Sequence, residues 1–203
     1  YPDGSARKLK ARYCARGFEQ KEGIGCYEAF APAAQWAPAR AMLAMAALLG
    51  LEAKQVGCAA ASMQAPAEEE VLAEMPLRLK KKGKVWKLKR CTYGLKQAPR
   101  SFFLHASSQL EQLGFTQPAA GPCLFISGSI ICLAHAGGML RAFKDQAAVE
   151  NLTSCMKSMN ILLNAEPGAA GYLGARAERG TAAGAITLRQ AGLIKRIAEA
   201  LHL

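Results

Sequence analysis

Apolar residues along the chain recur at the three- and four-residue spacing of helices that bury one face. Residues 39–51, rich in Ala, Leu and Met, predict a buried helix that ends near Gly50. Pro99 stands in the first turn of a second predicted helix that Gly114 closes, and Asp145 is suited to cap a third. The apolar face of the second predicted helix consists of Phe103, Ala106, Leu110 and Leu113. That of the third consists of Val149, Leu152, Met156 and Met159, and that of the last consists of Leu193, Ile194, Ile197 and Leu201.

Short apolar runs between these segments predict strands. The predicted strands are residues 8–16, 52–61, 85–88, 123–126, 129–134, 172–174 and 185–188. Gly137 and Gly138, which stand between two apolar runs, have the conformational freedom that a two-residue hairpin turn requires. Strands mixed with helices that pack on one face of a sheet predict an α+β architecture.

The size and charge of the chain limit the number of domains and the classes of partner that we expect. It has 203 residues, of which 51% are apolar and 20% charged, so we expect residues 1–203 to form one globular domain with a sizeable core. The net charge of +11 favours polyanionic partners such as nucleic acid or an anionic membrane face. Only Asp3 and Asp145 are aspartates, so the chain is poor in the short carboxylates that divalent metals favour.

Seven cysteines are spread along the chain without a C-x-x-C pair, a pattern typical of neither a disulfide framework nor a zinc site. We expect such a chain in a reducing intracellular compartment, cytoplasmic or nuclear. No signal peptide is recognised at the start, and serine and glycine interrupt the apolar residues 122–140, which favours a buried hairpin over a membrane helix. We therefore expect a soluble protein without a membrane partner.

Three stretches of sequence, taken in order, resemble one protein family. They are Arg-Gly-Phe-Glu-Gln-Lys-Glu-Gly-Ile at 16–24 with Phe-Ala-Pro at 30–32, Val-Trp-Lys-Leu-Lys at 85–89 with Tyr-Gly-Leu-Lys-Gln-Ala-Pro-Arg at 93–100, and Pro-Cys-Leu-Phe at 122–125. Weaker similarities at 172–174 and 186–190 extend the match over nearly the whole chain. The set resembles the reverse transcriptase, or RNA-directed DNA polymerase, region of copia-type retrotransposon Pol polyproteins.

The resemblance implies the right-hand polymerase fold, with fingers and an antiparallel palm sheet that carries helices on one face. The thumb, RNase H and integrase portions of the polyprotein would lie outside this chain. The resemblance also implies a two-metal mechanism, in which palm carboxylates hold paired Mg²⁺ ions that activate the primer hydroxyl and neutralise the transferring phosphate.

Glycine occupies every position where the resemblance implies a catalytic aspartate. The first falls on Gly57, and the Tyr-Val-Asp-Asp turn of the family falls on residues 135–138, which places Gly137 and Gly138 at its aspartates. The aromatic gate against ribonucleotides falls on Ser62. Because glycine offers no anionic oxygen, we expect no bound Mg²⁺ or other cofactor in this copy and an inactive pseudoenzyme.

Basic and amide residues near these motifs are candidates for nucleotide binding. The resemblance implies that Lys10, Arg12 and Arg16 face the triphosphate, and that Gln97, beside Lys96 and Arg100, lies along the incoming nucleotide. The alternative is a solvated strand edge and loop. A separate basic patch could follow a phosphate backbone while Trp86 stacks on a base, or it could be a surface strand with Trp86 facing the core. The patch consists of Lys80, Lys81, Lys82, Lys84, Lys87, Lys89 and Arg90.

Two other features are interpreted as structural. Residues 68–70, three consecutive glutamates, predict a solvated acidic turn, because consecutive residues cannot all converge on one metal. His135 receives no role, since no second ligand stands at a metal spacing from it. The main hypothesis is thus a degenerate reverse transcriptase domain that binds RNA or DNA template-primer nonspecifically beside the remainder of a Pol polyprotein. A noncatalytic basic nucleic-acid-binding module and a decayed reading frame whose product does not fold remain as alternatives.

Overall fold

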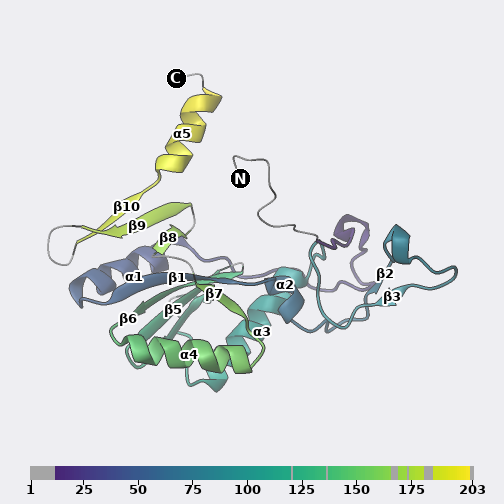
Figure 1. The fold of residues 1–203 in the computed structure, drawn as a ribbon, viewed down its shortest axis with the longest axis horizontal. Helices are drawn as coiled ribbons and strands as arrows, with labels where there is room; N and C mark the ends of the chain where they lie inside the picture. Colours follow the sequence, from purple (N-terminus) through teal and green to yellow (C-terminus); the bar gives the residue numbers. More distant parts are fainter. Residues whose placement is uncertain are drawn as a thin grey trace, which may run out of the picture.

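The computed structural model describes residues 12–119, 121–135, 137–165, 169–172, 174–180 and 185–201. At its centre lies a five-stranded antiparallel sheet with the order β4-β5-β6-β1-β7 (Figure 1). Its strands are β1 (Glu52–Cys58), β4 (Leu124–Ser127), β5 (Ile130–His135), β6 (Gly138–Phe143) and β7 (Leu163–Ala165). Antiparallel sheets combined with helices confirm the expected mixture of α and β structure.

Two helices cover one face of this sheet. The buried positions of α3 (Ala98–Gln112) and α4 (Gln146–Ser158) pack against Phe125 and Phe143 of the sheet. Asp145 caps α4, because its Oδ1 accepts a hydrogen bond of 2.9 Å from the backbone N–H of Ala147. Both helices were predicted from the spacing of apolar residues, and the cap was predicted from the aspartate at position 145.

A third helix, α1 (Trp36–Leu48), covers the opposite face (Figure 1). Its Met42 and Leu43 pack in a second core with Leu133 and Leu140. The expectation that helices pack on one face of the sheet therefore holds for α3 and α4, but α1 lies on the other face. The reason is that residues 130–134 of β5 are all buried, and a strand that is apolar on both faces requires a layer on each side.

A smaller three-stranded sheet, ordered β10-β9-β8, lies on the α1 side (Figure 1). It comprises β8 (Ala169–Tyr172), β9 (Ala175–Arg179) and β10 (Ile186–Arg189), and Ala177 and Ile186 pack against the second core. The strand predicted at 172–174 is confirmed only at Tyr172, because Gly174 lies in the turn before β9 and residue 173 lies outside the described residues. The last helix, α5 (Ala191–Ala200), forms where it was predicted, points away from the sheets and contributes no buried residue.

The segment before α1 has little regular structure. Residues 8–16 were predicted as a strand pair near a sheet edge, but in their described part only Cys14 forms a bridge, with Tyr93, and the 3-10 helix η1 (Gly17–Glu19) follows. A two-stranded sheet of β2 (Leu72–Ala73) and β3 (Trp86–Lys87) packs nearby, and the short helices are α2 (Ala61–Gln64) and η2 (Leu77–Leu79). The strand predicted for residues 52–61 ends at Cys58, before α2.

Helices long and apolar enough to cross a membrane do not occur among the described residues.

Candidate functional site

The three glycines singled out in the sequence meet in the structure. Gly57 of β1 and Gly138 of β6 are partners across the antiparallel ladder. The backbone N–H of Cys58 donates a hydrogen bond of 2.6 Å to the carbonyl oxygen of Gly137. On its other side, Gly57 pairs with Asn164 of β7. A strand end and a hairpin thus come together where the resemblance places the catalytic aspartates.

Residues directly opposite in an antiparallel pair point to the same face, with Cβ atoms about 5 Å apart. Side chains at positions 57 and 138 would therefore stand next to each other, on the side of the sheet that carries Ala53 and Leu140 and faces α1. Because both positions are glycine, the sheet presents only backbone atoms at this point of the face.

Gly137 occupies the end of the hairpin. Its φ of +94° lies in the left-handed region, and a Cβ there would stand 3.3 Å from the Cβ of Ala61 in α2. Gly138 begins β6 and pairs with His135 of β5, so the prediction that both glycines form the turn is wrong for Gly138. The backbone conformation at position 137 therefore favours glycine, whereas the strand conformation at position 138 does not.

Substitute ligands for a metal ion are missing from the part of the chain that the structure describes, because no group of three His, Cys, Asp or Glu side chains converges there. Cys58, which follows Gly57 in the sequence, is a poor donor, since burial raises the pKa of its thiol to about 12 and keeps it protonated. Ser62, the expected gate position, lies in α2. The described residues therefore do not fit a pair of Mg²⁺ ions.

A buried cation on the opposite face of β6 was not anticipated from the sequence. Arg141 of β6 is only 4% exposed, and its Nη1 donates a hydrogen bond of 2.8 Å to Oγ1 of Thr153. Its Nε has no hydrogen-bond partner, and no carboxylate within the described ranges pairs with it. Burial lowers the pKa of Arg141. Burial raises the pKa of the Cys58 thiol, and the positive charge of Arg141 lowers it by a smaller amount. Arg141 thus lies on the α4 side of the sheet, opposite to the face of positions 57 and 138.

Gln97, the predicted nucleotide contact, is buried and bonded within the protein. Its Nε2 donates to the carbonyl oxygen of Gly25 at 2.8 Å and to Glu69 Oε2 at 2.8 Å, while its Oε1 accepts from Gln20 Nε2 at 3.1 Å. Glu69 also accepts a hydrogen bond of 3.1 Å from the backbone N–H of Tyr27. The prediction of a purely solvated acidic turn is therefore wrong for Glu69, which anchors residues 20–27.

The other members of the predicted nucleotide set also have protein partners. Arg100 forms an ion pair of 2.5 Å with Glu28, and the guanidinium of Arg12 lies 5.5 Å from the centre of the Tyr93 ring. Arg16 is 58% exposed and pairs with two carboxylates. Lys10 lies outside the described residues. Sequence reasoning found these cations but not the carboxylates that hold them.

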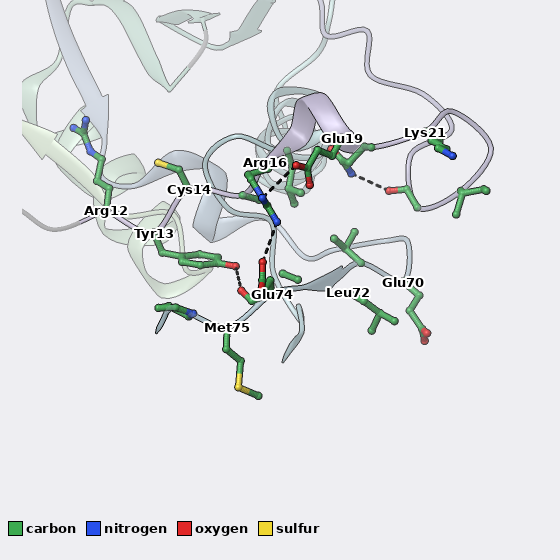
Figure 2. Close-up of a pocket in the computed structure, with 18 residues that line it drawn as sticks. Arg12, Tyr13, Cys14, Arg16, Glu19, Lys21, Glu70, Leu72, Glu74 and Met75 are labelled. Carbon is green, nitrogen blue, oxygen red and sulfur yellow. Dashed lines mark hydrogen bonds and ion pairs between the residues drawn. The ribbon is translucent and has the colours of Figure 1, made fainter. Parts of the chain in front are cut away.

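Arg12 and Arg16 line a cleft of about 950 Å³ between residues 12–25 and 70–76 (Figure 2). Lys21 adds a third positive charge, but Glu19, Glu70 and Glu74 line the same cleft and balance it. Arg16 bridges two of them, at 3.3 Å to Glu19 and 2.9 Å to Glu74. The three glycines of the candidate centre do not line this cleft.

The basic patch is exposed along its length. Two of its cations are paired with carboxylates of the preceding segment, Lys80 with Glu74 at 2.5 Å and Lys87 with Glu70. Trp86 does not face the core: its half-buried ring packs edge-on against Tyr13, with 5.5 Å between the ring centres and 62° between the ring planes. Stacking of Trp86 on a base stays a prediction. The indole belongs to a contact between two surface segments.

Comparison with known proteins now identifies the class. The family model described as reverse transcriptase (RNA-dependent DNA polymerase) matches residues 3–203. The chain belongs to this family.

Its relatives make it a copia-type member. The chain is 30% identical over 211 residues, 99% of its length, to the retrovirus-related Pol polyprotein from transposon TNT 1-94 of Nicotiana tabacum. It is also 30% identical over 127 residues to those from transposons RE1 and RE2 of Arabidopsis thaliana, which cover 61% of it. The chain spans only 16% of the first relative and 9% of the other two. No solved structure matches it significantly.

Proposed function

We propose that this chain is the fingers and palm part of the reverse transcriptase domain of a copia-type Pol polyprotein, in a form that cannot add nucleotides. One observation carries the proposal: Gly57, Gly137 and Gly138 meet at the end of β1 and the start of β6. Residues 1–203 act as one domain in this proposal, with η1, β2 and β3 in the fingers and the five-stranded sheet in the palm.

The loss of activity follows from the chemistry of the two-metal step. Paired Mg²⁺ ions need anionic oxygens to bind and to stabilise charge on the transferring phosphate. Backbone at positions 57, 137 and 138 supplies no negative charge. Each loss of about 1.4 kcal/mol of transition-state stabilisation slows the step tenfold, so missing ligands worth several kcal/mol lower the rate by orders of magnitude.

Primer extension on an RNA template tests the proposal, with Mg²⁺ and with Mn²⁺. We expect no template-dependent product from the parent chain, and such a product above background would refute the proposal. The companion variant carries Gly57→Asp, Gly137→Asp and Gly138→Asp, and product from it would support the assigned positions. A Gly128→Asp variant is the matched control for strain, because Gly128 also has a positive φ, +52°, in the turn between β4 and β5.

A second candidate function is a noncatalytic module that binds nucleic acid. The exposed basic patch and the net charge of +11 favour it. Binding to RNA and to DNA measured across salt concentrations tests this function, because phosphate contacts release counterions and make affinity fall with salt. Affinity that does not change with salt would exclude it.

A further inference from the structure

One carboxylate connects the cleft to the basic patch. Glu74 Oε2 lies 2.9 Å from Nη2 of Arg16, which lines the cleft (Figure 2), and Glu74 Oε1 lies 2.5 Å from Nζ of Lys80, the first residue of the patch. The backbone oxygen of Glu74 accepts a hydrogen bond of 2.9 Å from the Tyr13 hydroxyl, which fixes the position of this residue.

The two cations are placed to hold a single anionic group. A carboxylate and a phosphate both present oxygens that accept charge-assisted hydrogen bonds, and the Arg guanidinium recognises either. Lys80 first, through a hydrogen bond and its charge, and then Arg16 hold the pKa of Glu74 below its ordinary value, so the position favours negative charge. All three side chains are more than half exposed, so a ligand can reach them and the ion pairs cost little to break.

We propose that Arg16 and Lys80 form a subsite for one phosphate of a nucleic-acid backbone, and that Glu74 occupies this subsite in the free protein. The inference rests on the proposed nucleic-acid binding and adds to it a mechanism of intramolecular competition. A phosphate that enters must displace the carboxylate, so Glu74 lowers the affinity of a surface that would otherwise run from the cleft into the patch.

Other glutamates of the chain provide matched controls. Glu70 pairs with a single cation of the patch, Lys87. Glu111, exposed near the end of α3, forms no ion pair with any described residue. Glu74→Gln, Glu70→Gln and Glu111→Gln each raise the net charge by one. Glu74→Gln frees Lys80 and leaves Arg16 with Glu19 as its only described carboxylate partner, Glu70→Gln frees Lys87, and Glu111→Gln frees no cation. Differences among them therefore report the pairing and not the overall charge.

The experiment measures binding of a fluorescent single-stranded oligothymidylate to the full chain and its variants from 50 to 200 mM salt. Each additional phosphate contact steepens the plot of log K against log salt by about 0.7 for a single strand. Because the subsite holds one phosphate, we expect Glu74→Gln to steepen it by about 0.7, so that affinity falls about 2.6-fold more than in the parent across this range. Glu70→Gln should steepen the plot by about 0.7, and Glu111→Gln should not change it.

A second comparison keeps the inference testable if Glu74→Gln alters the fold, which circular dichroism would reveal. Lys80→Gln should change the salt dependence little in the parent, where Glu74 already neutralises Lys80, and should reduce it clearly in the Glu74→Gln background. Equal slopes for Glu74→Gln and Glu111→Gln, or equal effects of Lys80→Gln in both backgrounds, would overturn the inference. So would a complete lack of binding at 50 mM salt, while the primer-extension result would stand independently.

Discussion

Gly57 lies directly opposite Gly138 in the ladder between β1 and β6. Two residues in this relation share a face of the sheet, so carboxylates there would stand about 5 Å apart and repel each other. A bound divalent cation removes that repulsion. The backbone geometry for a paired-carboxylate site is therefore present, although its side chains are not.

We predict that the double variant Gly57→Asp with Gly138→Asp binds Mg²⁺ or Mn²⁺ and that the parent does not. Repulsion should lower the melting temperature of the variant without metal, and the metal should raise it again because it binds the folded state only. Thermal unfolding with and without 10 mM MgCl₂ measures both effects. The double Asn variant is the isosteric neutral control, and an equal rise in that control would contradict the prediction.

Replacing Arg141 with leucine should stabilise the fold. Arg141 is buried with an unpartnered Nε and without a described carboxylate partner, and an unsatisfied buried polar group costs about 1–3 kcal/mol. Its partner Thr153 keeps a hydrogen bond after the change, because the Thr153 hydroxyl also donates to the carbonyl oxygen of Val149 at 2.8 Å. Urea unfolding should therefore give Arg141→Leu a free energy of unfolding higher by about 2 kcal/mol.

Lys54 offers the control for this change. It is the cross-strand partner of Arg141 on β1, but its side chain is 41% exposed and pairs with Glu52. Lys54→Met should change stability by less than about 1 kcal/mol. If Arg141→Leu destabilises the chain, the buried guanidinium contributes to the fold in a way that its contacts do not account for.

The sequence predicted those parts of the fold that local periodicity determines. The helices α1, α3 and α4 repeat apolar residues at helical spacing, and the strands β4 and β5 are short apolar runs; all five form close to where they were predicted. The strand β9 was missed because its sequence, Ala-Arg-Ala-Glu-Arg, has little intrinsic preference for a strand and pairs only through its neighbours.

The candidate site was predictable in its glycines but not in its contacts. The resemblance of the surrounding sequence to the family was enough to assign Gly57 and Gly138 to the candidate site. The partners of Gln97 come from residues 20, 25 and 69, and Trp86 packs against Tyr13, which is far away in the sequence. Such long-range contacts depend on how segments fold together, and a local pattern contains no information about them.

His105 should make the chain less stable in mild acid. It is a half-buried residue of α3 whose Nε2 lacks a described partner, and its pKa is lowered, first by burial and then by the positive charge of Arg90. Because the folded state has the lower pKa, the unfolded chain takes up the proton first as pH falls below about 6.5. Stability is therefore complete above that pH and declines as pH falls toward the pKa of the folded state.

Thermal unfolding between pH 7.5 and pH 5.5 measures this dependence. The melting temperature of the parent should fall as pH is lowered from 7.5 to 5.5. The melting temperature of His105→Leu should fall less, because this variant lacks the group that titrates. His135 and His202 remain in both proteins and serve as internal controls. Identical pH profiles for the two proteins would show that His105 does not cause the dependence.

Gly17→Ala should detach the N-terminal segment from the loop that precedes α3. A Cβ on Gly17 would lie 1.8 Å from the carbonyl oxygen of Gly94, so the two backbones could not keep their contact. Overpacking of this kind costs about 1–3 kcal/mol. Gly23→Ala is the matched control: Gly23 has a φ of +80° but nothing within 4 Å of its Cβ position, so only backbone strain of about 1 kcal/mol applies. Limited proteolysis should cut residues 12–25 faster in Gly17→Ala than in Gly23→Ala, and equal rates would mean that the close backbone approach does not hold this segment in place.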